Sequence, residues 1–227
     1  MQPELLVLGG GIGKRLEGLT GCSIAKCALP ISDSLTGIDL LKRQLSTLGP
    51  VTFSVQHYFD WYLRNSGGNR VEHQAETGIA QTLIEKDHPV VIIPNDCVID
   101  LSFIPGMIES HKSGTITWAV TTWQHPQMLE YTGSTIVGGA IVGREATSVM
   151  RTPVMLIEPD ILKSFIQPGE DFYWKTIRRI EDENATRMQR GEPSILNAFI
   201  TSTPCFDYGT PARLETLRKE LHEITNL

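Results

Sequence analysis

Cysteine and histidine are sparse in this sequence, and their spacing excludes the common zinc sites. The four cysteines include no C-x-x-C pair, and the six histidines show no H-x-x-x-H spacing. Cys22 and Cys27 are separated by four residues, and no matching His or Cys pair follows to complete a zinc site. We therefore expect reduced structural thiols, with Cys97 as a small buried side chain at a strand end.

Long apolar runs and an excess of positive charge are also missing. No run approaches the ~20 residues that a membrane-spanning helix requires, and no basic segment precedes the first apolar residues. The net charge of -6 argues against nucleic acid as the main partner. The serines and cysteines lack a nucleophile-elbow pattern, so nucleophilic catalysis is not expected. These absences predict a soluble, cytoplasmic protein with neither a nucleic-acid nor a membrane partner.

The composition is that of an ordinary globular domain. The chain has 227 residues, of which 41% are hydrophobic and 20% are charged. A chain of this size buries a large core without a disulfide or metal staple. Because no internal repeat, low-complexity tract or long linker interrupts it, we expect a single domain over residues 1–227. Its oligomeric state, a homo-oligomer included, stays open.

The N-terminal stretch is the most informative part of the chain. Residues 5–8 are apolar and predict one buried parallel strand. Four glycines and three cations then follow: Gly9, Gly10, Gly11, Gly13, Lys14, Arg15 and Lys26. Glycines let backbone N–H groups approach an anion closely, and nearby cations suit a triphosphate. The stretch therefore predicts a nucleotide-phosphate site at the carboxyl end of the first strand.

Two familiar glycine motifs do not fit this stretch. The dinucleotide pattern G-x-G-x-x-G requires a third glycine where the sequence has Lys14 or Leu16. The P-loop pattern requires its first glycine at Leu8 and a Ser or Thr at Arg15. A plainer interpretation stays beside the phosphate site, namely a glycine-rich turn from strand to helix with surface cations.

A third pattern does fit. Residues 8–16 read LGGGIGKRL, and Lys26 and then Leu29-Pro30-Ile31 follow. This order resembles the signature of the sugar-1-phosphate nucleotidyltransferases, or nucleotide-sugar pyrophosphorylases, which reads L-A-G-G-x-G-T-R-L, then P-K, then L-P-I. The departures are Gly9 for Ala, Lys14 for Thr and Ala25 for Pro.

The resemblance implies roles for these residues. Arg15 and Lys26 would be catalytic: Arg15 would stabilise the triphosphate and the charge that develops at the α-phosphate, and Lys26 would contact the phosphates from the other side. The implied nucleotide-binding residues are Leu8, Gly9, Gly10, Gly11, Gly13 and Lys14, with Gly10, Gly11 and Gly13 as backbone donors.

Two aspartates are candidates for holding a metal ion. Asp96 follows the apolar strand at 89–93, at the end where sites gather in open α/β sheets, although it could instead cap a turn. Asp207 opens the segment 207–211, DYGTP, which alone also spells an ordinary helix start. The resembled family holds its metal with an Asp after Asn or Gly and with the Asp of a late D-x-G-T-P motif. The resemblance therefore implies that Asp96 and Asp207 hold Mg²⁺ as the cofactor.

Signals for the base and the sugar are less direct. Residues 76–81, ETGIAQ, resemble the family segment that reads the base, which implies that Glu76, Gly78 and Gln81 bind the nucleotide and slightly favours dTTP or UTP. The alternative is a plain helix turn with a solvated Gln81. The family's E-K-P motif, whose lysine contacts the sugar phosphate, is absent. Its stand-ins are Arg144 and Lys175, with Arg151 as a competitor, and each could instead be a surface cation.

Apolar periodicity predicts the remaining elements. The expected strands are 51–55, 70–73, 89–93, 115–121, 136–142, 153–157 and 198–203, and the expected helices are 36–48, 58–63, 76–86, 159–165, 170–190 and 212–221. Strands alternate with helices in the first half, which predicts a three-layer α/β fold with a mostly parallel mixed sheet. The resemblance implies the GT-A-like, Rossmann-like fold of the nucleotide-diphospho-sugar transferases.

The resemblance also implies a reaction. A magnesium-dependent nucleotidyltransferase of nucleotide-sugar biosynthesis would condense a nucleoside triphosphate with a sugar-1-phosphate, giving an NDP-sugar and pyrophosphate. The alternative is a non-catalytic sensor of nucleotides or nucleotide sugars that has the same fold. A Rossmann dehydrogenase is a third interpretation, weakened by the failed glycine pattern. The sequence does not identify the sugar.

Overall fold

The computed structural model describes residues 2–9, 14–20, 26–48, 50–55, 70–73, 79–128, 133–143, 149–167 and 175–225. The helix expected at 58–63 lies outside these ranges. No helix within them is both long enough and apolar enough to cross a membrane.

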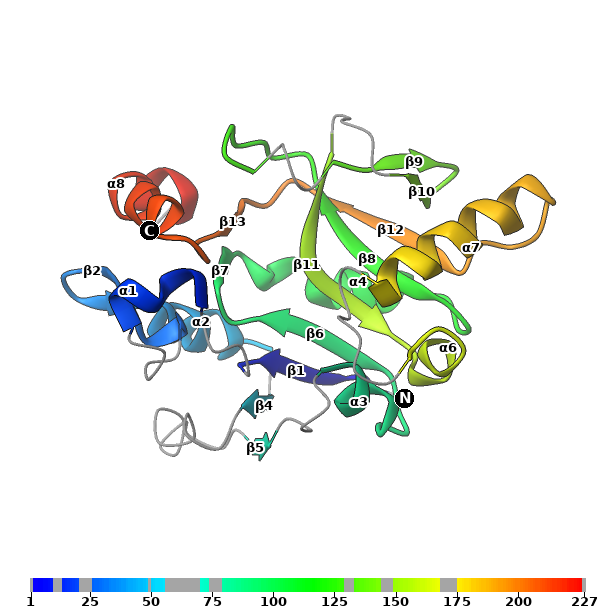
Figure 1. Cartoon of the computed structure of the whole chain (residues 1–227), viewed down its shortest axis with the longest axis horizontal. Coiled ribbons are helices and arrows are strands. Elements are labelled where there is room, and N and C mark those ends of the chain that lie inside the picture. The colour runs from blue at the N-terminus through cyan, green and yellow to red at the C-terminus, as the bar shows by residue number, and fades with distance from the viewer. Residues whose placement is uncertain are drawn as a thin grey trace.

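A nine-stranded sheet runs through these residues in the order β5-β4-β1-β6-β11-β8-β12-β10-β9 (Figure 1). Its strands are β1 (Glu4–Leu8), β4 (Thr52–Val55), β5 (Arg70–His73), β6 (Val90–Pro94), β8 (Ile116–Thr121), β9 (Thr135–Val137), β10 (Ala140–Gly143), β11 (Met150–Ile157) and β12 (Leu196–Thr201). Only β10 and β11 run against the other seven strands, as their pairings show. The mixed, mostly parallel sheet is thereby confirmed.

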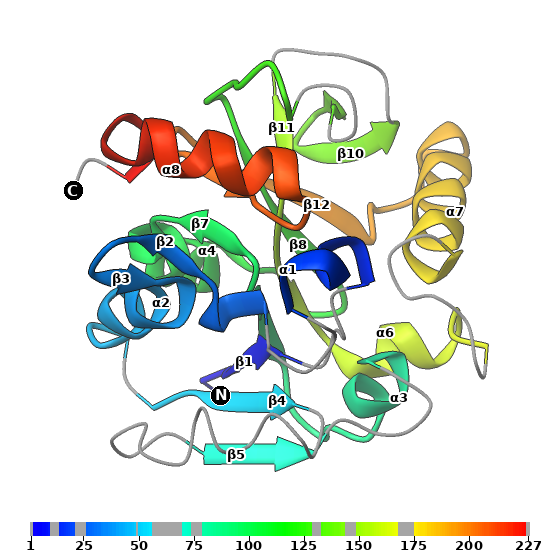
Figure 2. The ribbon, with the colours of Figure 1, turned by 60° about the vertical axis from the view of Figure 1, so that its left-hand side comes forward.

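Helices cover both faces of the sheet, which makes three layers (Figure 2). On one face lie α2 (Gly37–Leu45) and α4 (Ile104–Ser110), and on the other lie α3 (Ile79–Ile84), α6 (Pro159–Lys163) and α7 (Ile177–Gln189). Side chains along β1 alternate between the two faces of the sheet. Leu5 and Val7 belong to the apolar cluster on the face of α2 and α4, and Leu6 belongs to the cluster on the face of α3, α6 and α7.

A third apolar cluster packs against α8 (Pro211–Thr225). It joins Leu214 and Leu217 of this last helix to Leu16 and Ile31 near the start of the chain. Arg218 also donates from α8 to the Pro30 carbonyl of β2 (Pro30–Ser32), which pairs with β3 (Leu35–Thr36). The last helix thus lies beside an early segment of the chain that includes β2, far from it in the sequence (Figures 1 and 2).

Two expectations require correction. The strand expected at 136–142 is a hairpin, because Gly138 and Gly139 have φ of 58° and 84° and turn the chain between β9 and β10. Cys97 is half-buried rather than buried. Cys27 and Cys205 are buried, and all three of these described cysteines are unbridged, as expected.

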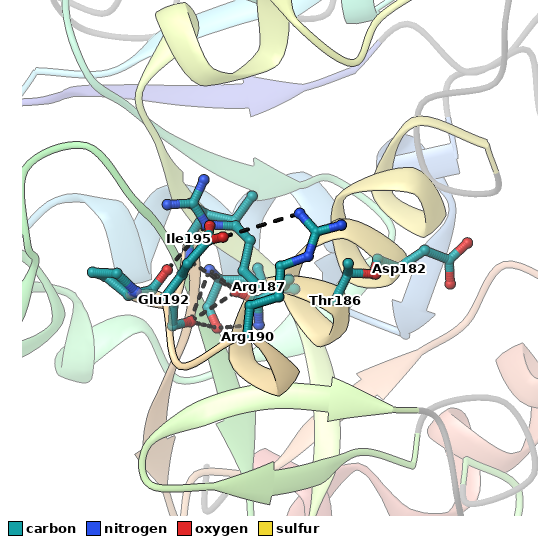
Figure 3. A network of polar contacts seen from close by, with 10 residues as sticks. Asp182, Thr186, Arg187, Arg190, Glu192 and Ile195 are labelled. Atoms are coloured by element: carbon teal, nitrogen blue, oxygen red, sulfur yellow. Dashed lines mark hydrogen bonds and ion pairs between the residues drawn. The ribbon is translucent and has the colours of Figure 1, made fainter.

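Polar contacts fix the turn from α7 into β12 (Figure 3). Arg187 donates to the Pro193 carbonyl at 3.1 Å, and the Thr186 hydroxyl donates to the Asp182 carbonyl at 2.9 Å. The fully buried Asn184 accepts from the N–H groups of Ile195 and Leu196. This network lies at the end of α7 and anchors that helix to the sheet.

Candidate functional site

Two neighbouring parallel strands end at the candidate site. β1 and β6 pair in register from Glu4 opposite Val90 to Leu8 opposite Pro94, so their carboxyl ends meet. Gly9 follows β1 directly and donates its N–H to the Ser54 carbonyl of β4 at 2.7 Å. Asp96 follows β6 after one intervening residue, Asn95. This edge is the place where open α/β sheets form their sites.

A short ribbon brings Asp207 to the same edge. β7 (Cys97–Ile99) pairs antiparallel with β13 (Cys205–Asp207), and Asp207 stands opposite Cys97. The next residue, Tyr208, donates its N–H to the Asp96 carbonyl at 3.1 Å. Two aspartates that lie 111 positions apart in the chain are therefore held by one backbone ladder.

Both carboxylates face Gly209. The position that a Cβ would occupy at this glycine lies 2.8 Å from Asp207 Oδ1, 3.0 Å from Arg15 Nη2 and 3.4 Å from Asp96 Oδ2. Two carboxylates and one guanidinium thus converge around a point that only a glycine leaves open.

Each carboxylate also has its own cation. Lys26 Nζ lies 2.6 Å from Asp96 Oδ2, and Arg213 Nη1 lies 2.9 Å from Asp207 Oδ2. Burial, together with the negative charge of Asp96, raises the pKa of Asp207, whereas the Gly209 N–H, Arg213 and Arg15 oppose that shift. Like charges brought together need compensation, and these cations supply it.

Tyr208 links β13 to the end of β6 through two hydrogen bonds. Its buried hydroxyl donates to the Asn95 carbonyl at 3.0 Å, while its backbone holds Asp96. A Cβ at Gly37, the first residue of α2, would lie 2.1 Å from that hydroxyl oxygen and 3.1 Å from the Cys27 carbonyl. Glycine at this position therefore lets the tyrosine reach the strand end.

The donor set fits a hard divalent cation. Mg²⁺ is commonly bound by one or two carboxylates together with substrate phosphates and water, rather than by a cage of protein ligands. Asp96 and Asp207 supply two such carboxylates at one point, and the described residues contain no group of three or more His, Cys, Asp or Glu that could hold a metal ion. The two aspartates therefore suit a metal ion that is shared with a phosphate ligand.

The other predicted residues have varied placements. Leu8 ends β1 and is half-buried, and Lys14 begins a 3₁₀ turn, η1 (Lys14–Leu16). Gln81 of α3 donates to Glu85, just after that helix, at 2.8 Å, and Lys175 is exposed just ahead of α7. The predicted residues outside the described ranges are Gly10, Gly11, Gly13, Glu76, Gly78 and Arg144.

Arg151 is not the surface cation or phosphate ligand that the sequence allowed. Its side chain is buried, donates to Glu181, to Ser134 Oγ and to the Gly143 carbonyl, and lies over the Trp118 ring at 4.8 Å. Glu181 is buried as well. The pair joins β11 to α7 and has a structural role.

Replacing Glu181 with glutamine tests this role. Glu181→Gln leaves the buried guanidinium of Arg151 without its counter-charge, which is expected to cost about 3–5 kcal/mol of unfolding free energy in urea denaturation. The double variant Arg151→Met/Glu181→Leu removes both charges and is expected to lose less than the single variant does. A Glu181→Gln protein as stable as wild type would show that the pair is dispensable.

A cavity at the opposite end of the strands contains a separate ion cluster. It measures about 570 Å³ and is lined by Glu4, Thr52, Lys86 and His88 among others. Glu4 pairs there with Lys86 at 3.1 Å and with His88 at 2.9 Å. Because these residues lie at the amino ends of β1, β4 and β6, they are remote from Asp96 and Asp207.

Three residues of the site were missed by sequence reasoning. Tyr208 lay inside the quoted motif but had no side-chain role, and neither Gly37 nor Arg213 was singled out. For Arg213 a signal exists, because a cation in the first turn of a helix opposes the helix dipole. For Gly37 and Tyr208 the sequence offers none, since their contact joins distant segments.

No family model and no curated protein matches the sequence. Solved structures do match. A protein from Bacillus anthracis assigned as a glucose-1-phosphate thymidylyltransferase, in complex with a sucrose, superimposes with a TM-score of 0.71 at 18% identity, over 100% of this chain and 96% of that chain. The inositol-1-phosphate CTP transferase from T. maritima has a TM-score of 0.70 at 16% identity, over 98% and 97%.

A third match agrees with these two. The UDP-glucose pyrophosphorylase from Acinetobacter baumanii has a TM-score of 0.68 at 12% identity, over 100% of this chain and 96% of that chain. The TM-scores establish a common fold. Identities this low leave the activity to be argued from the site. The chain therefore has the fold of these solved nucleotidyltransferases, and the resemblance seen in its N-terminal motif is confirmed at the level of the fold.

Proposed function

We propose that this chain is a single nucleotidyltransferase domain that condenses a nucleoside triphosphate with a sugar-1-phosphate, with Mg²⁺ as cofactor. The observation that carries the proposal is the convergence of Asp96, Asp207 and Arg15 beside Gly209, with Lys26 on Asp96. Carboxylates and cations in one place suit a reaction in which two phosphate anions must meet. The shared fold supports the same reaction class.

The proposed chemistry is one displacement at phosphorus. A phosphate oxygen of the sugar-1-phosphate forms a bond to the α-phosphorus of the nucleoside triphosphate. The bond from that phosphorus to the oxygen that bridges the α- and β-phosphates breaks, and pyrophosphate leaves. Arg15 would neutralise charge that develops at the α-phosphate, and Lys26 would bind the phosphates from the side of Asp96. Asp96 and Asp207 would hold Mg²⁺, which neutralises phosphate charge when bound.

The residues implied for substrate choice keep proposed roles. Leu8 ends β1, Gly9 follows it and Lys14 begins η1, and all three would bind the triphosphate. Gly10, Gly11 and Gly13 would donate backbone N–H groups to it. Glu76, Gly78 and Gln81 would bind the base, with dTTP or UTP favoured, and Arg144 and Lys175 would be candidates for the sugar phosphate.

Pyrophosphate release tests the proposal. Wild-type protein is incubated with Mg²⁺ and a panel of nucleoside triphosphates and sugar-1-phosphates, and at least one pair is expected to release pyrophosphate only when Mg²⁺ is present. Asp96→Asn is expected to abolish this release. Asp100→Asn is the matched control, because Asp100 follows the next strand, β7, and caps a 3₁₀ turn by accepting from the Ser102 N–H at 2.9 Å, a role that Asn also fills.

A sensor of the same fold is the competing proposal. Nucleotide binding without release from any pair would favour it, since a ligand that binds only the folded protein still raises the melting temperature.

A further inference from the structure

Arg213 fixes the orientation of Asp207. Its Nη1 donates to Asp207 Oδ2 at 2.9 Å, and the Gly209 N–H donates to Asp207 Oδ1 at 2.6 Å. Both oxygens of this carboxylate thus have a donor. The side chains of Arg213 and Asp207 are 14% and 26% exposed, so the pair is partly buried.

The position of Arg213 in its helix is unfavourable for the helix itself. It is the third residue of α8, whose backbone is kinked at Glu220. The amino-terminal turn carries the positive end of the helix dipole and disfavours a cation. Asp207, six residues earlier, accounts for the placement, and the Gln127 carbonyl accepts a second, longer bond of 3.4 Å from Nη2.

The charges of the described site would repel a bare metal ion. Three cations, Arg15, Lys26 and Arg213, face the two carboxylates. A divalent cation that enters alone adds positive charge to this group and must displace or share the donors of Asp207. A metal-bound triphosphate instead brings net negative charge, and its oxygens can take over the displaced cations.

We propose, on the basis of the nucleotidyltransferase function proposed above, that Arg213 is a positioning residue that competes with the divalent cation for Asp207. The metal ion then binds tightly only together with the nucleoside triphosphate. Arg213 holds the carboxylate in place before the metal ion arrives and couples the two binding events. The coupling is reciprocal, so the metal ion raises the affinity for the nucleotide by the same factor.

Binding of Mn²⁺, followed by the electron paramagnetic resonance of the free ion, tests this proposal. Without nucleotide, R213Q is expected to bind Mn²⁺ at least ~10-fold more tightly than wild type, because the competing charge is gone. R213K keeps the charge and is expected to stay near wild type. R218Q is the matched control on the same helix, since Arg218 contacts the Pro30 carbonyl and not Asp207, and it is expected to leave Mn²⁺ binding unchanged.

A purely structural role predicts the opposite sign. If Arg213 only holds Asp207 in place, R213Q binds Mn²⁺ equally or more weakly, and that result overturns the proposal.

Wild-type protein gives a second test that needs no variant: Mn²⁺ is expected to raise the affinity for UTP or dTTP at least ~10-fold, and an unchanged affinity also overturns the proposal. Neither result touches the proposed function, provided that wild type releases pyrophosphate. Absence of both nucleotide binding and release would instead overturn the proposed function and this inference with it.

Discussion

Lys26→Ala is expected to lower turnover about 100-fold or more, because it removes a cation from the place where phosphate charge develops. Lys26 is the partner of Asp96 at 2.6 Å, so its loss also leaves that carboxylate without its ion pair. The stability change is expected to be modest, since the pair is partly exposed and partly solvated. Turnover is measured by pyrophosphate release, and stability by urea denaturation.

Lys86→Ala provides a closely matched control. The side chains of Lys86 and its partner Glu4 are 13% and 15% exposed, against 14% and 20% for Lys26 and Asp96. The control pair lies at the amino ends of the same strands, so Lys86→Ala is expected to cost similar stability and leave turnover intact. Arg15→Ala is expected to behave like Lys26→Ala. Equal turnover losses in the Lys26 and Lys86 variants would refute the role given to Lys26.

Gly37→Ala is expected to destabilise the protein, although alanine has a higher helix propensity than glycine. Alanine in place of glycine ordinarily stabilises a helix by about 0.5–1 kcal/mol. Here the new methyl group would lie 2.1 Å from the Tyr208 hydroxyl oxygen, which holds the Asn95 carbonyl. Overpacking of this kind typically costs about 1–3 kcal/mol, and the displaced tyrosine would also shift Asp96 and Asp207. Both unfolding free energy and turnover are therefore expected to fall.

The double variant Gly37→Ala/Tyr208→Phe separates this contact from other causes. Tyr208→Phe alone loses one buried hydrogen bond, at about 1 kcal/mol. In the Gly37→Ala background it removes the clashing oxygen, so the double variant is expected to be more stable than Gly37→Ala. If the two losses simply add, the assigned contact between Gly37 and Tyr208 is wrong.

Much of the fold could be predicted because it follows from local patterns. Four apolar residues after Pro89 predict β6, and Thr36 with Asp39 forms the capping box at the start of the expected helix α2. The β9–β10 hairpin was mistaken for one strand, because its apolar run conceals a turn at Gly138 and Gly139. The β7–β13 ribbon could not be predicted, since three-residue strands carry too little pattern and pair across the chain.

The candidate site shows the same division. The strand end before Asp96 and the segment that opens with Asp207 could be found as separate sequence features. That their carboxylates face one point beside Gly209 depends on the ribbon and on Tyr208. The burial of Arg151 was hidden for a similar reason, because its counter-charge Glu181 lies 30 residues away on α7.

Anomalous diffraction from a crystal grown with Mn²⁺ and UTP or dTTP tests the central claim most directly. The arrangement of Asp96 and Asp207 predicts one strong manganese peak bound by a carboxylate oxygen from each aspartate, beside Gly209. A manganese peak that touches neither aspartate, in a crystal where the nucleotide is bound, would contradict the claim.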